Sequence, residues 1–307
     1  MPKQSMSFLV GDNPFHGISH LSQARVRARS NDKGHGSVEY FAQLVKLALE
    51  NGADGFMFSV DDTTLSILQT LSNETKIDNV QLHAIVPYAY EYVRRATNAG
   101  GVSGLARQLA KEMVFSSNAK ILALNAGGLL GFNPSALLKT YVSYEISRIK
   151  SVTKTVSCLK SVMLHEIITD MALALNLEDL FKSYIRFMKK SSIKAGFETR
   201  NFTYLVNKFG EWNIDFKDVT LTTSFNKVGF QMEPSKAECE AALKCARDAE
   251  VIAMSILASG YLRPADAVEY VESLQDLSGV VVGVSKERHA TETFRLLKNE
   301  LNRCNRV

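Results

Sequence analysis

Short apolar runs recur along the chain, and each ends in polar residues and is followed by a stretch with helical periodicity. The runs are FLVGDNPFHG, GFMFSVDD, VQLHAIVP, AKILALNAGG, SVMLHEIITD, AGFETRN, VTLTTSFNKV, EVIAMSILASG and GVVVGVSK, between Ser7 and Lys286. Strands that alternate with helices favour a parallel sheet, and this many repeats predict an α/β fold of the (β/α)8 TIM-barrel type. Nine runs are one more than such a barrel needs. We therefore expect VQLHAIVP or AKILALNAGG to be irregular, or the first strand to plug the barrel.

The stretches between the runs carry helix signals of their own. Residues 37–49 place apolar side chains on one face, and Asn51-Gly52 ends that helix. Ser235 begins a capping box, Pro264 suits a first helical turn, and Ser285 is expected to cap the last helix. No linker or repeat divides the chain, so residues 1–307 are predicted to form one barrel domain.

Charge and cysteine usage narrow the class of protein. The net charge is +4, and acidic and basic residues are interspersed, which argues against nucleic-acid binding. The four cysteines include no C-x-x-C pair, so a reducing cytoplasm is expected. No signal peptide and no apolar run of about 18 residues is found, so membrane spanning is not expected. A small molecule is thus the expected partner.

Chemistry in such barrels sits where the strands end, so polar residues at these points are the candidate site. His165 is the candidate acid/base group, with Asp61 and Glu198 as carboxylate partners. Arg200 shares a strand face with Glu198 and should keep that carboxylate ionised. The residues expected to bind substrate are Asn13, His16, Arg200, Asn201 and Asn226. The alternatives are a structural histidine bonded to the backbone and a Glu198–Arg200 salt bridge at the rim.

A divalent metal and a bound anion are further possibilities. His16, His20, His83, His165 and Glu198 could together bind a metal, although no H-x-H or H-E-x-x-H motif occurs and His83 could be a core residue. Gly283, Ser285 and Lys286 join the last strand to a helix, where main-chain N–H groups can bind phosphate. Ordinary capping by Ser285 is the alternative.

Two connections are long. The segment from Gly11 to Gly36 is either a lid over the site or a solvated loop. The glycine-rich stretch after Asn125 is either an anion nest or a tight turn.

From about Ser161 to Leu297 the chain resembles the aldo-keto reductase superfamily in the order and texture of its motifs. VMLHEIITD is similar to the family's fourth strand with its active-site histidine. Nearer the start of the chain, outside this range, FMFSVDDTT is similar to the second strand with its aspartate. VIAMSILASGYL and GVVVGVSKERHATE are similar to the last two strands. The resemblance implies a TIM barrel, with His165 and either Asp61 or Asp62 in the catalytic positions.

The departures from the family concern its catalytic tetrad of Asp, Tyr, Lys and His. No tyrosine follows the aspartate within residues 63–70, and no lysine occurs in residues 83–87, although Tyr88 or Tyr90 could substitute in space. The pair that holds the nicotinamide has become Arg200-Asn201, and Met254 replaces the aromatic residue that stacks on the ring. We therefore expect NADPH to bind weakly or not at all.

Three hypotheses follow. The first is a barrel enzyme that acts on a small polar, anionic metabolite by acid/base chemistry, with lyase, isomerase, hydrolase and oxidoreductase reactions all open. The second is an NADPH-dependent oxidoreductase with a modified tetrad, in which Lys286 and Arg288 meet the 2′-phosphate. The third is a non-catalytic binding or scaffold barrel. Substrate and oligomeric state are left open.

Overall fold

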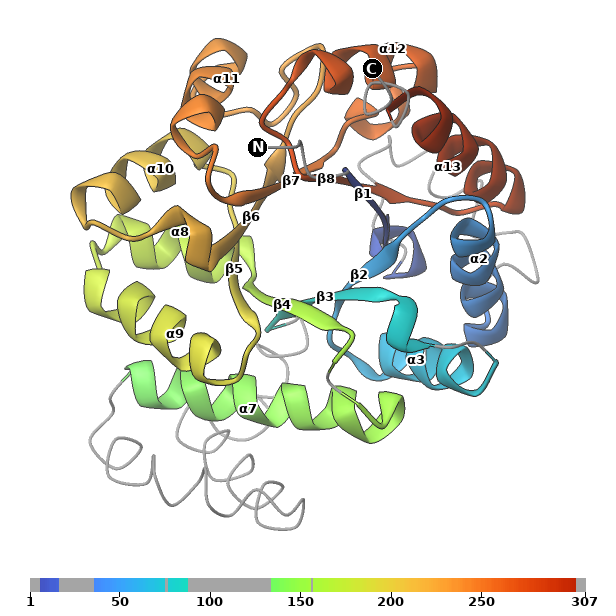
Figure 1. Cartoon of the computed structure of the whole chain (residues 1–307), viewed down its shortest axis with the longest axis horizontal. Helices are drawn as coiled ribbons and strands as arrows, with labels where there is room; N and C mark the ends of the chain where they lie inside the picture. Colours follow the sequence, from blue (N-terminus) through green and yellow to red (C-terminus); the bar gives the residue numbers. More distant parts are fainter. Residues whose placement is uncertain (1–5, 17–35, 75–76, 88–133, 156, 302–307) are drawn as a thin grey trace.

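Eight parallel strands close into a barrel in chain order, β1 to β8 (Figure 1). The structure is a computed structural model, and it describes residues 6–16, 36–74, 77–87, 134–155 and 157–301. The strands are β1 Ser7–Gly11, β2 Gly55–Ser59, β3 Gln81–Val86, β4 Leu159–Leu164, β5 Lys194–Glu198, β6 Val219–Ser224, β7 Glu250–Met254 and β8 Gly279–Gly283. The predicted (β/α)8 barrel is confirmed.

The question of the surplus strand is partly answered. The first run forms β1, which pairs with both β2 and β8, so it closes the barrel and does not plug it. VQLHAIVP forms β3, a barrel strand with one register shift against β4, between Leu82 and His83. AKILALNAGG lies outside the described residues.

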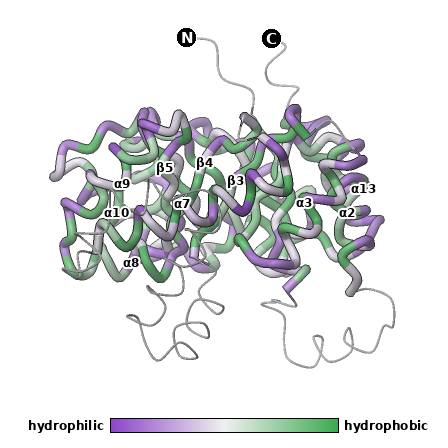
Figure 2. Tube along the Cα trace, turned by 90° about the horizontal axis from the view of Figure 1, so that it is seen from below, coloured by the Kyte–Doolittle hydropathy of each residue, from purple (hydrophilic) through white to green (hydrophobic). Residues whose placement is uncertain are grey.

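An outer ring of helices surrounds the strands (Figure 1), and the side view shows polar and apolar residues mixed along the labelled helices (Figure 2). The helices are α2 Val38–Glu50, α3 Asp62–Glu74, α7 Pro134–Thr153, α8 Glu166–Ala174, α9 Glu178–Lys190, α10 Phe202–Glu211, α11 Lys236–Cys245, α12 Pro264–Ser273 and α13 Glu287–Leu301. Short 3-10 turns are η1 Asn13–His16, η2 Ile77–Asn79, η3 Phe216–Asp218 and η4 Ala258–Gly260. No helix in the described ranges is both long and apolar enough to cross a bilayer.

Most of the predicted helix starts are confirmed. Ser37 and Ser235 occupy the N-cap positions of α2 and α11, and each hydroxyl accepts a backbone N–H at 3.2 Å. Pro264 is the first residue of α12. The prediction for Ser285 is wrong by one position. Val284 stays buried after β8 ends, and the first helical hydrogen bond of α13 runs from the Ala290 N–H to the Lys286 carbonyl.

The barrel interior is closed halfway along its axis by side chains from six strands. We call this layer the apolar plug; it consists of Leu9, Met57, Ile85, Met163, Ile252 and Val281. Gly196 of β5 contributes no side chain to this layer and so leaves room for Met163, because a Cβ at Gly196 would lie 2.3 Å from Cγ of Met163. Side chains alternate in direction along a strand, so each residue two positions after a plug residue points into the C-terminal end. We call that end the mouth.

The opposite end of the barrel interior, the floor, is polar. His83 lies there, two residues before Ile85 of the plug, and its Nδ1 is 2.9 Å from Oγ of Ser161. Burial lowers the pKa of His83 to about 4, so the ring is a neutral core group at physiological pH. The plug separates His83 from the mouth, and the idea that it joins His165 around a metal is therefore wrong.

Candidate active site

A cavity of about 640 Å³ opens at the mouth, between the ends of the strands and the loops that follow them. The predicted site residues that line it are Asn13, His165, Glu198, Arg200, Gly283 and Ser285. His16 and Asp61 lie behind Asp12, which lines the cavity itself. The predicted positions Asn201, Asn226 and Lys286 are not part of this lining.

His165 follows β4 directly and occupies the N-cap position of α8. Its ring Nδ1 accepts a hydrogen bond from the Ile167 N–H at 3.2 Å. Its backbone N–H donates to the Val86 carbonyl at 2.9 Å, which continues the pairing of β4 with β3. Burial lowers the pKa of His165, although the Glu166 carboxylate acts in the opposite direction. Because Nδ1 is an acceptor, the neutral ring carries its hydrogen on Nε2. The ring is thus arranged to donate a hydrogen bond.

Glu198 is the last residue of β5, and only 9% of it is exposed. Its Oε2 accepts the Glu166 N–H at 3.3 Å. Burial raises the pKa of Glu198 to about 7; the charges of Glu166 and Asp12 add to this shift, and Arg200 opposes it. Near neutral pH this carboxyl can therefore both accept and release a proton.

Arg200 does not pair with Glu198 as the sequence predicted. Its Nε donates to Glu166, and its Nη1 donates to Oγ of Ser224 at 3.1 Å and to Gln231. The guanidinium charge is therefore largely balanced by Glu166, and burial of Glu198 outweighs the remaining attraction. At neutral pH Glu198 is therefore only partly ionised, and not fully ionised as the sequence predicted.

Asn201 and Asn226 are both engaged in local structure. The Asn201 amide donates to Asp170 at 3.2 Å, and this carboxylate on α8 also accepts from the Thr199 hydroxyl and the Arg200 N–H. The Asn226 amide bonds both the N–H and the carbonyl of Phe230, each at 2.8 Å. The two asparagines hold the loops after β5 and β6, so they shape the rim without facing the cavity.

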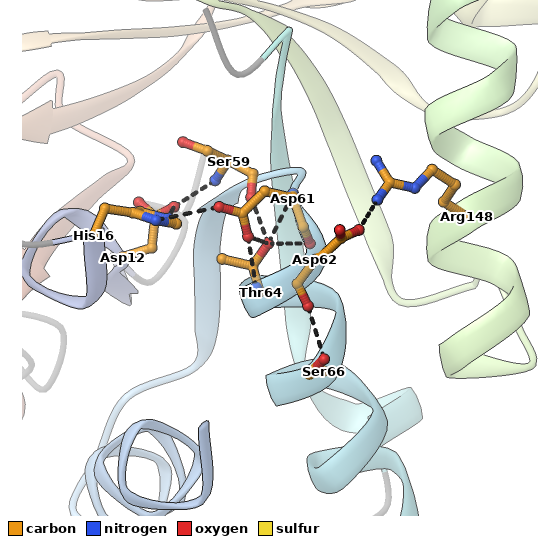
Figure 3. Close-up of polar contacts among 8 residues, drawn as sticks. All are labelled: Asp12, His16, Ser59, Asp61, Asp62, Thr64, Ser66 and Arg148. Atoms are coloured by element: carbon orange, nitrogen blue, oxygen red, sulfur yellow. Dashed lines mark hydrogen bonds and ion pairs between the residues drawn. The ribbon is translucent and has the colours of Figure 1, made fainter. Parts of the chain in front are cut away.

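His16 lies between two carboxylates, as Figure 3 shows. Its Nε2 is 3.1 Å from Oδ2 of Asp12, and its Nδ1 is 3.2 Å from Oδ2 of Asp61. We call this arrangement the histidine clamp. Burial disfavours a charged ring, but the hydrogen bond to Asp12 and the two carboxylate charges outweigh it and raise the pKa of His16. The sequence named His16 and Asp61 but not the Asp12 that joins them to the cavity.

The adjacent residues Asp61 and Asp62 have different roles. Asp61 caps the start of α3, since its Oδ1 accepts the Thr64 N–H at 2.8 Å. Asp62 points outward and pairs with Arg148 of α7 at 2.5 Å (Figure 3). Of the two aspartates that the sequence could not separate, Asp61 is therefore the one next to the mouth.

A loop that the sequence did not single out forms the β7 side of the cavity. Ser255, Ala258 and Ser259 have positive φ values of 55°, 44° and 58°, a conformation that costs free energy in residues other than glycine. Ser259 lines the cavity, and its Oγ is buried without a hydrogen-bond partner among the described residues. The pattern S-x-x-x-S-G directly after a strand was the signal available for this loop.

The last strand completes this side of the cavity. Gly283 and Ser285 line it together with His289 on the first turns of α13, while Lys286 is exposed next to them. The predicted anion-binding turn thus belongs to the mouth and not to the floor. Within the described ranges the cavity lining contains neither tyrosine nor lysine. Tyr88, Tyr90 and His20 lie outside those ranges, as do most of the loop at 11–36 and the stretch after Asn125. No group of three or more metal-binding side chains occurs among the residues that the structure describes.

Comparison with protein-family models gives no match, and comparison with curated protein sequences gives none. Comparison with solved structures does give matches. A protein from Pseudomonas aeruginosa, provisionally named an aldo-keto reductase, aligns with a TM-score of 0.58 at 10% identity over 98% of this chain and 95% of its own. The fold is that of the aldo-keto reductases. An aldo-keto reductase from Bacillus halodurans in its holo form aligns with a TM-score of 0.53 at 7% identity, over 87% of each chain.

A third match extends the likeness to another source. An aldose reductase from Schistosoma japonicum aligns with a TM-score of 0.50 at 10% identity, over 97% of this chain and 87% of its own. At such identities the likeness establishes the barrel and its connectivity. The reaction has to be argued from the side chains at the mouth.

Proposed function

We propose that this protein is an acid/base enzyme that transfers a proton on a small polar metabolite bound in the mouth of the barrel. The observation that carries the proposal is Glu198, a buried carboxyl that lines the cavity and has a pKa raised to about 7. Burying a carboxyl without an ion-pair partner is costly, and such groups concentrate at catalytic sites. A scaffold barrel would have no use for it.

The elementary step that these groups support is proton abstraction from a carbon next to a carbonyl. Ionised Glu198 takes the proton, and the C–H electron pair moves onto the carbonyl oxygen as an enolate forms. The neutral ring of His165 donates a hydrogen bond from Nε2–H to that oxygen and stabilises the charge that develops on it. Return of the proton to the same carbon regenerates the substrate, or its epimer if it arrives on the opposite face. Where that carbon carries a hydroxyl, the hydroxyl proton moves to the enolate oxygen, the hydroxyl oxygen becomes the new carbonyl, and Glu198 returns its proton to the former carbonyl carbon, which completes an aldose–ketose isomerisation. Expulsion of a leaving group instead gives a lyase reaction.

The other side of the cavity suits an anionic group of the same substrate. Gly283 and Ser285 precede α13, where unpaired N–H groups and the helix dipole favour negative charge, and Lys286 adds a mobile cation nearby. The Ser259 hydroxyl is a further donor without a partner in the described part of the chain. A phosphate or carboxylate held here would leave the rest of the molecule to reach Glu198.

The test is exchange of substrate hydrogen with solvent, because it needs no knowledge of the product. The protein is incubated in D₂O with dihydroxyacetone phosphate and with glyceraldehyde 3-phosphate, and deuterium incorporation is followed by proton NMR. Wild-type protein should catalyse exchange, and Glu198→Gln should slow it by about a hundredfold or more. Glu211→Gln, which changes an exposed carboxylate of α10, is the matched control and should exchange like wild type. Equal exchange by Glu198→Gln and wild type would refute the proposal.

A second candidate, reduction with NADPH, is favoured by the barrel match and by a cavity that reaches from His165 to the start of α13. Arg200 and Arg288 would meet the nicotinamide and the 2′-phosphate. Against it, Met254 replaces a stacking ring, and Arg200 is tied to Glu166. Fluorescence titration with NADPH separates the two ideas. Micromolar binding favours the oxidoreductase, and absence of binding at 1 mM favours the cofactor-free enzyme.

A further inference from the structure

Asp12 and Glu198 lie on opposite sides of the mouth. Asp12 directly follows β1, and Glu198 ends β5. In a closed barrel of eight strands in chain order, β1 is four strands away from β5 in either direction, so the two strands are across from each other. Both side chains line the same cavity, and both are at least nine-tenths buried. A small molecule in the mouth therefore lies between these two carboxyl groups.

The histidine clamp fixes the direction in which Asp12 points. Its Oδ2 accepts the Ser59 N–H at 2.6 Å and is 3.1 Å from Nε2 of His16. His16 is held from its other nitrogen by Asp61, which is itself held by Thr64 (Figure 3). No described residue is hydrogen bonded to Oδ1 of Asp12. One oxygen is thus anchored by two donors, and the other is left for the cavity.

We infer that Asp12 is a specificity-determining residue that binds a hydrogen-bond donor of the substrate, a hydroxyl or ammonium group, across the mouth from Glu198. This inference rests on the proposed function, since it concerns the substrate of the same site. An acceptor group would face the Asp12 carboxylate and be repelled. A donor group on the substrate can hydrogen bond to the oxygen that the clamp leaves free, because Asp12 lines the cavity.

The cavity wall carries groups of two kinds. Asp12 and Glu198 place carboxyl groups on opposite sides of it, and the charge of Arg200 is engaged by Glu166. The loops after β7 and β8 carry hydroxyls, helix N–H groups and Lys286. A substrate with an anionic group for these loops and a hydroxyl or ammonium donor for Asp12 fits both kinds, and a phosphorylated polyol or amino alcohol is the simplest such compound.

The test measures binding and does not need turnover. Calorimetric titration compares glycerol 3-phosphate, which has two hydroxyls, with propyl phosphate, which has the same chain and none. O-Phosphoethanolamine is the ammonium probe. Wild-type protein should bind one or both donor-bearing probes at least tenfold more tightly than propyl phosphate, and the tighter of the two identifies the donor. Asp12→Ala should remove this preference and leave the affinity for propyl phosphate unchanged.

Two further variants separate positioning from bulk charge. His16→Gln should reduce the preference, because Asp12 loses an anchor. Asp62→Asn removes one negative charge from an exposed neighbour of Asp61 that pairs with Arg148, and it should leave the preference intact. Equal affinities for the three phosphates in wild type, no binding of any of them, or an unchanged preference in Asp12→Ala would each overturn the inference. Glu198→Gln should retain the preference, so loss of exchange in that variant and loss of preference in Asp12→Ala report on separate claims.

Discussion

Replacing Glu198 by Gln should stabilise the protein at alkaline pH. A carboxyl whose pKa rises from 4.5 to about 7 on folding binds its proton more tightly in the folded state. Its contribution to stability is therefore fully present below pH 4.5 and is lost as the pH rises to 7. Ionisation of Glu198 therefore lowers the unfolding free energy of the wild-type protein, relative to its value below pH 4.5, by about 1 kcal/mol at pH 5 and about 3 kcal/mol at pH 8.

Urea denaturation at pH 5 and pH 8 measures this difference directly. The gain in unfolding free energy of Glu198→Gln over wild type should be about 2 to 3 kcal/mol larger at pH 8 than at pH 5. Glutamine keeps the shape and can still accept the Glu166 N–H, so the comparison isolates ionisation. Glu211→Gln, at an exposed site paired with Lys208, should show no such pH dependence. A gain that is the same at both pH values would show that Glu198 ionises normally and would remove the basis for its catalytic role.

Three further outcomes are expected. His16→Gln should lose more stability at pH 5.5 than at pH 9, because the raised pKa of His16 between Asp12 and Asp61 gives stability that is present below 6.5 and lost as the pH rises; urea denaturation at both pH values measures it. Lys286→Glu should weaken phosphate binding about fivefold in low salt without lowering the melting temperature, and unchanged affinity would return the turn to a purely structural role. Gly55→Ala should lower the unfolding free energy by about 3 kcal/mol or more, since its Cβ would lie 2.0 Å from the Gln81 carbonyl oxygen, whereas Gly210→Ala meets nothing within 4 Å and should be neutral or stabilising.

The sequence predicted the barrel well because strand and helix periodicities are local properties. The ends of the strands can be located for the same reason, so the sequence places Asn13, His165, Glu198 and Gly283 at the mouth, and all four line the cavity. These positions depend only on where each strand stops.

The partners of these residues could not be predicted, because they depend on register between strands. Arg200 shares a strand face with Glu198 in the sequence, yet its side chain pairs with Glu166, the first residue of α8 after the neighbouring strand β4. The pKa of Glu198 is raised mainly by burial, and the pairing of Arg200 with Glu166 weakens the one charge that would lower it. Neither burial nor this pairing can be predicted from the sequence of a single strand. The histidine clamp likewise joins β1 to β2 through contacts between residues 45 positions apart.

The apolar plug separates the ionisable groups of the floor from those of the mouth along the barrel axis. The charges that shift the pKa of His83 on the floor are Glu250, Lys160 and Lys194, and those that shift the pKa of Glu198 at the mouth are Glu166, Arg200 and Asp12. The two sets share no member because the plug holds the two groups of charges apart along the barrel axis; its low polarisability would strengthen an interaction between them and would not screen it. Charge can therefore be redesigned on the floor, for solubility or for stability, without retuning the proton chemistry at the other end of the same strands.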